Sequence, residues 1–507
     1  MTNIFVASAI SRNLRNSLLC FLLIISYTVI PQNQISKKSS AKESLPINLS
    51  KDDLFNKTKQ LISNKEYKKA CKLMRINYAR FSENFEINWL YAHVFWLNNK
   101  PTKAKTKFKK AYSINNNNKE LQLDYARFLY QNGKTQELEK FLKQSNNYET
   151  KDAEYLLMQA NSNFWKGDIK KAKEKIKIIN ETYPNSDITK KLEAEIEDLT
   201  SGYIRTNFEY QTDSQPLNYF GTHIKIGEYV SRYLNPQLEI SNYNFSPQKE
   251  SALIVNLKNE IYFDRIKLSA TINGGIYANN SDKTDWIGGL SLKKSLFEKT
   301  SLKLGYIKNA LFSTIASTTF NLTQQTGFAE LEHENKYVIF NAGFNHNFYD
   351  DGNYINSISS WILSQPLKVY KFSFQFGYGF NYTDAKDILF IYDNNGEGVY
   401  DPYFTPEEQQ IHSGLFILQY TPTKDLTIKG KLNYGIEAIV QNPYPVEVAP
   451  NDFEIGGFYE APFDYMDIEG SINYNFSKKF SVNATYIFQE TFFYDRQNIN
   501  VGLNFTF

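Results

Sequence analysis

The sequence predicts an α-helical repeat solenoid followed by an antiparallel transmembrane β-barrel of about 16 strands. Three observations predict this fold class. Small residues recur at a fixed interval over residues 51–200, the segments after Gly202 alternate apolar and polar residues, and the joins between those segments alternate between short and long. A strand sends successive side chains to opposite faces, so a wall between lipid and water requires such alternation.

The N-terminal 50 residues have the layout of a targeting segment. Arg12 and Arg15 precede an apolar run over residues 18–30, which is too short to cross a bilayer stably. We expect a signal peptide over residues 1–30 and a linker over 31–50, the alternative being an uncleaved N-terminal anchor. Cys20 would leave with the signal peptide, and Cys71 would then have no partner for a disulfide.

Residues 51–200 repeat with a period of 34 residues. The recurring positions are Ala70, Ala104, Leu138 and Ala172, then Ala92, Ala126 and Ala160, and finally Gly133 and Gly167. Small residues at two fixed points of such a unit are needed where stacked helices approach closely. The segments Lys65-Glu66-Tyr67-Lys68-Lys69-Ala70 and Gly167-Asp168-Ile169-Lys170-Lys171-Ala172, the second followed by Pro184, resemble the tetratricopeptide repeat (TPR), although Leu138 and Pro101 depart from its pattern. The resemblance implies a domain of about four helix-turn-helix units.

An aromatic residue recurs at the twelfth position of three successive units. These residues are Trp96, Tyr130 and Phe164, again 34 apart. In the repeat family this position lies on the concave surface, so the resemblance implies a ladder of rings that could stack on the apolar faces of sugars. Packing of the rings between helices explains the same spacing equally well.

Residues 201–507 read as strands throughout. The pattern is strongest in residues 369–382, where six aromatic residues alternate with polar residues or glycine, and it recurs in the final ten residues, which end at Phe507. The expected strands are 203–211, 218–229, 234–245, 251–263, 266–278, 285–296, 300–309, 324–334, 337–348, 354–364, 369–382, 409–421, 425–436, 463–476, 480–491 and 498–507. A single such strand would fit a soluble sandwich equally well.

The joins between the expected strands favour a barrel over a sandwich. The long joins, 310–323, 383–408 and 437–462, all follow odd-numbered strands, whereas the joins after even-numbered strands include short turns such as Asp264-Arg265. Outer-membrane barrels have short periplasmic turns and longer outer loops in this order. Sixteen strands also leave room for an aqueous lumen.

Charge is divided unevenly along the chain. Residues 51–200 hold 29 Lys and Arg against 20 Asp and Glu, whereas the barrel region carries a net charge of about −10. Four acidic residues alternate with apolar ones in two strands and are expected to face the lumen, because charge on a lipid face is destabilising. They are Glu330, Glu332, Asp467 and Glu469. They either select a substrate or only hydrate the wall.

No pattern for catalysis, a cofactor or a metal is present. The five histidines have no catalytic or metal-ligand spacing, and no phosphate-binding or nucleophile-elbow motif occurs. Barrel-wall hydrolases use Ser and His, but no nucleophile stands beside His223 or His412 in the sequence. The loop 393–398 has the alternating oxygens of a calcium loop without its later glutamate. We therefore expect neither an enzyme nor a cofactor or metal site.

The order of signal peptide, TPR domain, barrel and terminal Phe507 resembles the exopolysaccharide export porins of Gram-negative bacteria, of the cellulose and poly-N-acetylglucosamine type, and the related YaiO-type barrels. Residues 400–406, Tyr-Asp-Pro-Tyr-Phe-Thr-Pro, look like a loop of the cellulose porins, with Thr405 in place of Ser.

That resemblance implies an outer-membrane channel for polysaccharide export whose periplasmic TPR domain binds polymer or partner proteins. The expected partners are outer-membrane lipid, a polysaccharide and periplasmic proteins, but no nucleic acid. The alternatives are a general porin and a surface or assembly barrel with a TPR scaffold.

Overall fold

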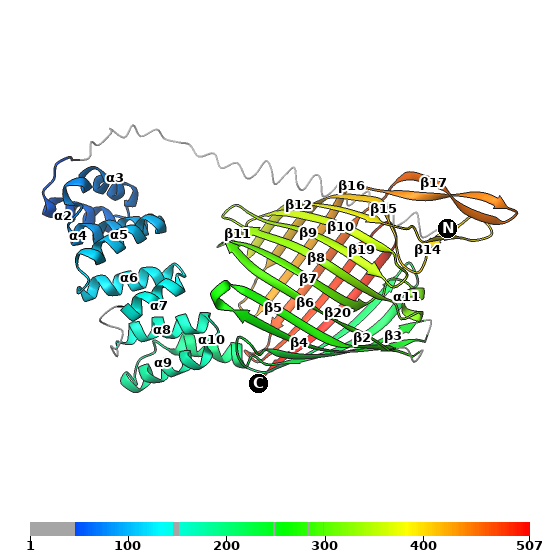
Figure 1. Ribbon diagram of the computed structural model, residues 1–507, viewed down its shortest axis with the longest axis horizontal. Helices are drawn as coiled ribbons and strands as arrows, with labels where there is room; N and C mark the ends of the chain where they lie inside the picture. The colour runs from blue at the N-terminus through cyan, green and yellow to red at the C-terminus, as the bar shows by residue number, and fades with distance from the viewer. Residues whose placement is uncertain (1–45, 145–151, 247–248, 281–283, 298) are drawn as a thin grey trace. The chain divides into compact units, whose positions relative to one another are not determined.

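The computed structural model describes residues 46–144, 152–246, 249–280, 284–297 and 299–507 (Figure 1). The expected signal peptide lies outside these residues, as does most of the linker. The chain divides into two compact units, residues 1–128 and 129–507, with the division inside one helix. Among the described residues, no helix is long and apolar enough to cross a bilayer.

Helices make up most of the described residues between 51 and 200, as the repeats predict. They are α2 (Lys51–Ser63), α3 (Tyr67–Asn77), α4 (Phe85–Leu97), α5 (Pro101–Ile114), α6 (Lys119–Gln131), α7 (Thr135–Gln144), α8 (Ala153–Trp165), α9 (Ile169–Thr182) and α10 (Lys190–Thr200), with a 3-10 turn at Tyr78–Phe81. All seven residues at the two repeated small-residue positions, Leu138 included, have no solvent exposure. Their burial explains the spacing, because a side chain larger than the space between the helices at each position would push them apart.

A left-handed residue ends the turn inside each repeat. The four positions are again 34 apart: Lys65 (φ 60°), Asn99 (φ 53°), Gly133 (φ 64°) and Gly167 (φ 72°). Glycine adopts this conformation without the clash between Cβ and carbonyl oxygen that other residues meet, and asparagine tolerates it better than lysine. The first repeat therefore holds a strained lysine at a position that favours glycine.

Replacing that lysine should stabilise the helical domain. We expect Lys65→Gly to raise the free energy of unfolding by about 1 kcal/mol, because the left-handed strain is removed from an exposed site. Urea titration of the full chain, followed by its helical circular-dichroism signal, measures the change. Lys65→Ala is the matched control, since it removes the same side chain but keeps Cβ, and it should not stabilise. Equal behaviour of the two variants would contradict the assignment of strain.

Sixteen antiparallel strands form the barrel wall. They are β1 (Tyr203–Asp213), β2 (Asn218–Gly227), β3 (Pro236–Ser246), β4 (Ser251–Phe263), β5 (Leu268–Asn279), β6 (Thr284–Phe297), β7 (Thr300–Ala310), β8 (Thr323–Glu334), β9 (Val338–Tyr349), β10 (Tyr354–Ser364), β12 (Phe372–Ala385), β15 (Glu407–Tyr420), β16 (Leu426–Ala449), β18 (Met466–Asn475), β19 (Phe480–Glu490) and β20 (Asp495–Thr506). β1 pairs with β20 from Tyr203↔Thr506 to Asp213↔Arg496, which closes the sheet. The predicted number of strands and their order are confirmed.

The two ends of the barrel differ in their connections. At the end where β1 starts and β20 finishes, the joins include a 3-10 turn at Asp264–Ile266 and the short strand β11 (Leu367–Val369). We call this the short-turn end. The opposite end, the long-loop end, carries the joins 311–322 and 386–406, which contain the helix α11 (Ile315–Thr319) and the hairpin β13 (Phe390–Tyr392) and β14 (Gly398–Tyr400).

The segment 437–462 is not the loop that its prolines suggest. β16 continues through it to Ala449 and returns as β17 (Asp452–Pro462), so that a ribbon projects past the wall at the long-loop end (Figure 1). β15 pairs with β16 no farther than Gln441. Beyond that residue β16 pairs on one side only, and prolines, which lack an N–H donor, fit such an edge. The long join predicted there does connect two neighbouring wall strands, but it forms a β-ribbon and not an irregular loop.

Candidate functional site

The two faces of the wall differ in chemistry. On β5, Ile272 and Ile276 are about half exposed on one face, while Asn273 and the fully buried Tyr277 lie on the other. Tyr277 packs with Phe312 from the join 311–322. The face that holds Tyr277 is therefore the inner one, and the outer face is apolar, as lipid requires.

The four acidic residues expected in the lumen lie on the inner face, and three of them are paired with lysines. Glu332 bonds to Lys293 Nζ at 2.5 Å, Glu330 lies 3.8 Å from Lys303 Nζ, and Glu469 bonds to Lys431 Nζ at 2.5 Å. Asp467 stands opposite Asn433 on β16. Lys303 and Lys431 come from strands adjacent to those of their acids, whereas Lys293 on β6 reaches across β7 to Glu332 on β8. Three of the four carboxylates are therefore neutralised by lysines on the inner wall rather than left as bare charges.

The join between β7 and β8 crosses the interior at the long-loop end. Phe312 packs against Tyr243 of β3 at 4.8 Å and Tyr277 of β5 at 5.9 Å between ring centroids. Leu311 and Leu322, at the base of the same join, pack against a cluster that includes residues of β10 and β12. One loop therefore contacts inner-face residues on widely separated parts of the wall.

Two further loops interlock with it. Tyr403, in the join 386–406, stacks on Tyr349 of β9 at 3.9 Å, and Phe404 stacks on Phe493 of the β19–β20 join at 5.0 Å between centroids. The hydroxyl of Thr314 donates to the carbonyl of Pro402 at 2.5 Å, which ties the first two loops together. We refer to residues 311–322, 400–406 and 491–494 as the mouth loops.

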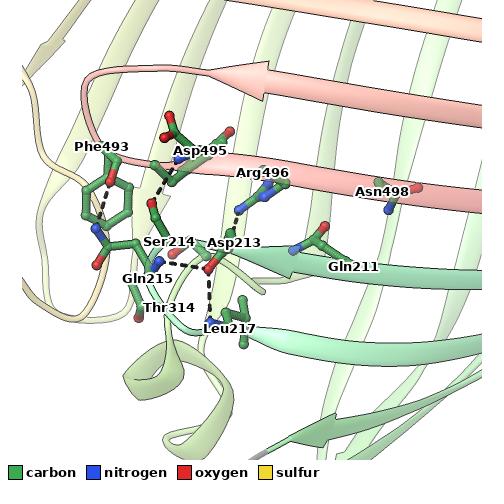
Figure 2. Close-up of polar contacts among 12 residues, drawn as sticks. Gln211, Asp213, Ser214, Gln215, Leu217, Thr314, Phe493, Asp495, Arg496 and Asn498 are labelled. Carbon is green, nitrogen blue, oxygen red and sulfur yellow. Dashed lines mark hydrogen bonds and ion pairs between the residues drawn. The ribbon is translucent and has the colours of Figure 1, made fainter. Parts of the chain in front are cut away.

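Asp213 organises the seam where β1 meets β20 (Figure 2). Its side chain is completely buried, and Oδ1 accepts hydrogen bonds from the backbone N–H groups of Gln215 (3.0 Å) and Leu217 (2.9 Å). Oδ2 lies 3.4 Å from Nη2 of Arg496 on β20. Gln215 donates to the carbonyl of Phe493 at 2.7 Å, so the β1–β2 turn is also held against a mouth loop.

A cavity of about 500 Å³ lies inside the barrel next to the mouth loops. Strands β8, β9, β10, β12, β15 and β16 contribute to its lining together with all three mouth loops. Its aromatic residues include Trp361, Tyr465 and Phe404, and its polar residues include Ser359 and Asn433. Among the described residues, its lining includes no Asp, Glu, Lys, Arg or His.

The repeated aromatic residues of the helices pack against neighbouring rings. Trp96 lies edge-on to Phe128 at 5.5 Å, and Tyr130 stacks on Trp165 at 5.0 Å between centroids. Phe164 is partly buried against the cluster formed by α8, α9 and α10. The rings are partly exposed, so packing between helices accounts for much of their surface while a binding role stays a prediction.

A polar cluster between α4 and α6 was not predicted from the sequence. Asp124 accepts hydrogen bonds from Trp89 Nε1 (3.0 Å) and Arg127 Nη1 (3.0 Å), and its Oδ2 lies 2.8 Å from His93 Nε2. Burial alone would raise the pKa of Asp124, but hydrogen bonds from His93, Arg127 and Trp89 hold it below its ordinary value. The cluster fixes two adjacent repeats in register.

The two histidines considered for hydrolysis have different surroundings. His412 lies on the outer face beside Tyr378, with its Nδ1 2.5 Å from the Tyr378 hydroxyl. His223 lies on the inner face between Ser241 Oγ (2.9 Å) and Glu209 Oε2 (3.1 Å). A hydroxyl therefore does stand beside His223, which the sequence did not reveal, but Ser241 is only 4% exposed. The trio acts as a hydrogen-bond network joining β1, β2 and β3.

In the loop considered for calcium, the Asp393 carboxylate accepts hydrogen bonds from backbone N–H groups of the same loop. Asp393 Oδ1 accepts from the N–H groups of Asn395 (2.8 Å) and Glu397 (2.9 Å) within the β13–β14 hairpin. These backbone hydrogen bonds lower the pKa of Asp393. Among the residues that the structure describes, no group of three or more His, Cys, Asp or Glu is arranged to hold a metal ion.

Comparison with known protein families supports the repeat assignment. A tetratricopeptide repeat family model matches residues 95–161. No curated protein matches the sequence. A bacterial polysaccharide outer membrane secretin is similar at 7% identity and a TM-score of 0.46, over 61% of this chain and 99% of that one.

Two solved structures from Pseudomonas aeruginosa are also similar. OpdK, crystallised with vanillate, is similar at 10% identity and a TM-score of 0.34, over 61% of this chain and 98% of that one. PilF is similar at 21% identity and a TM-score of 0.24, over 28% of this chain and 65% of that one. These likenesses assign no substrate. The chain thus combines tetratricopeptide-repeat helices with a closed antiparallel barrel of sixteen strands.

Proposed function

We propose that the protein is an outer-membrane channel for the export of an extracellular polysaccharide, with a periplasmic TPR domain that binds polymer or partner proteins. The observation that carries the proposal is the closed sixteen-stranded barrel with an apolar outer face and an inner face rich in amides and hydroxyls. A sheet with an open edge is not tolerated in lipid, and the pairing of β1 with β20 leaves the sheet without such an edge.

The inner wall suits a polymer that carries many hydroxyl groups. On β9 the inner positions include Asn341, Asn345 and Asn347, and on β20 they include Asn500 and Asn504. Amide side chains both donate and accept hydrogen bonds, as sugar hydroxyls do. A glycan can therefore exchange hydrogen-bond partners along such a wall.

Planar-bilayer recording tests this function. We expect the purified full-length chain, whose mouth loops are intact, to conduct a low and fluctuating current. When a soluble polysaccharide is supplied at the short-turn side, additional blocking events should appear. Current steps that no polysaccharide affects would favour a general porin. A permanently silent barrel would contradict the channel function.

One observation favours a second candidate, a surface or assembly barrel. The mouth loops interlock at the long-loop end, and the β16–β17 ribbon projects past the wall with exposed Tyr444, Val446 and Tyr459. A silent channel whose ribbon is required for cell adhesion would support this alternative.

A further inference from the structure

We propose that the cavity beside the mouth loops is a binding subsite for an uncharged glycan segment. The inference deepens the proposed function by naming the class of substrate, and it rests on that function only for the route by which the glycan arrives. The site lies where a chain moving along the lumen would meet the mouth loops.

The first argument is the chemistry of the lining. Trp361, Tyr465 and Phe404 supply aromatic rings, while Ser359, Gln409 and Asn433 supply hydroxyl and amide groups. Carbohydrates present apolar C–H faces that pack on such rings and hydroxyls that pair with such polar groups. A charged ligand would find no counter-ion among the described lining residues.

The second argument is polar capacity that the protein leaves unused. Asn433 Nδ2 lies 3.3 Å from the Tyr465 hydroxyl, but Asn433 Oδ1 is buried and has no hydrogen-bond partner among the described residues. Ser313 Oγ in the same lining is also buried and unpartnered there. Buried polar atoms are rarely left unsatisfied, so a ligand hydroxyl that pairs with them is favoured.

The third argument is the contrast along the inner wall. Trp361 also borders a second cavity of about 600 Å³, whose lining includes Lys293, Glu332 and Glu334. Charged residues are therefore present nearby on the inner face but do not line the cavity at the mouth loops. The change from paired charges to neutral groups selects against a charged repeat unit at that point.

Calorimetric titration of the full-length protein in detergent tests the inference. The probes are cellohexaose as the neutral glycan, hexagalacturonate as the anionic one, the glucosamine hexamer as the cationic one, and a polyethylene glycol of similar length. We expect saturable binding of cellohexaose alone. Trp361→Ala should weaken it about tenfold, because the stacking surface is lost. Asn433→Leu should also weaken it, while Trp286→Ala, which changes a tryptophan on the outer face, should leave it unchanged.

The outcomes separate the subsite from the proposed function. Heat-dependent gel mobility of each variant checks that the barrel is folded, and Asn433→Leu carries the test if Trp361→Ala does not fold. Absence of cellohexaose binding, equal binding of a charged hexamer or of polyethylene glycol, or an unchanged affinity in both variants would overturn the inference. Specific cellohexaose binding by a barrel that never conducts would uphold the subsite while contradicting the channel.

Discussion

Replacing residues 312–321 by Asn-Gly should raise the single-channel conductance of the barrel at least about threefold. This segment carries Phe312 and α11, which occupy the interior at the long-loop end. A sixteen-stranded wall is wide enough to leave an aqueous lumen once the inserted loop is gone. The expected result is a large, steady conductance in planar bilayers in place of a low and fluctuating one.

The design of this deletion follows from the base of the loop. The N–H of Leu311 donates to the carbonyl of Leu322 at 2.9 Å, so the two residues already face each other as a hairpin pair. A two-residue Asn-Gly turn closes such a pair with the twist of the flanking strands. β7 and β8 should therefore keep their register in the variant.

The matched control shortens the projecting ribbon instead. Removing residues 446–454 takes a similar length of chain from the tip of β16 and β17, beyond the last pairing with β15 at Gln441. We expect no change in conductance, because this tip lies past the wall. If the loop deletion yields a folded barrel with the conductance of the parent, the mouth loops do not limit the pore.

The wall itself could be predicted because its signal is local. Alternation along each strand reflects the two environments that its residues face. The structure places the wall strands within a few residues of the expected ones, except that β16 runs on to Ala449. The helices could be predicted equally well from the sequence, since Ala92, Ala126 and Ala160 repeat at the points where helices touch. In both regions the residue pattern repeats at the same interval as the contacts: every second residue in the strands, and every 34 residues in the helical repeats.

The contents of the lumen could not be predicted because they depend on contacts between distant segments. The pairing of Lys293 with Glu332 joins residues 39 apart in the sequence, and the bond from Thr314 to Pro402 spans 88 positions. Nothing local indicates that a long join folds inward rather than outward. The neutral cavity likewise draws its lining from six strands, the three mouth loops and Tyr465 in the join between β17 and β18, so no single sequence motif could indicate it.

The same limit applies to the network around His223. Ser241 stands opposite His223 only in the register of β2 and β3, which cannot be read from either strand alone. The β16–β17 ribbon could not be predicted for a different reason. Its prolines are typical of loops, and only the loss of the β15 partner beyond Gln441 makes them acceptable in a strand.

The second large effect is expected at the seam. Asp213→Ala should lower the free energy of unfolding by roughly 3–5 kcal/mol, because it removes the partner of a largely buried Arg496 and leaves the N–H groups of Gln215 and Leu217 without their acceptor. Asp213→Asn should lose less, since its amide oxygen can still accept from the turn. Urea unfolding of the barrel in lipid vesicles, followed by the shift between folded and unfolded gel bands, measures both.

Asp495 provides a control on the same seam. Its side chain is exposed, and the contacts of Asp495 with Ser214 run through its backbone, so Asp495→Ala should change stability by no more than about 0.5 kcal/mol. A strand seam closes the barrel only if its two strands meet in one register, and Asp213 ties the end of β1 to both its turn and β20. If Asp213→Ala unfolds at the urea concentration of the parent, backbone pairing alone holds the seam, and the buried carboxylate serves only to shape the turn.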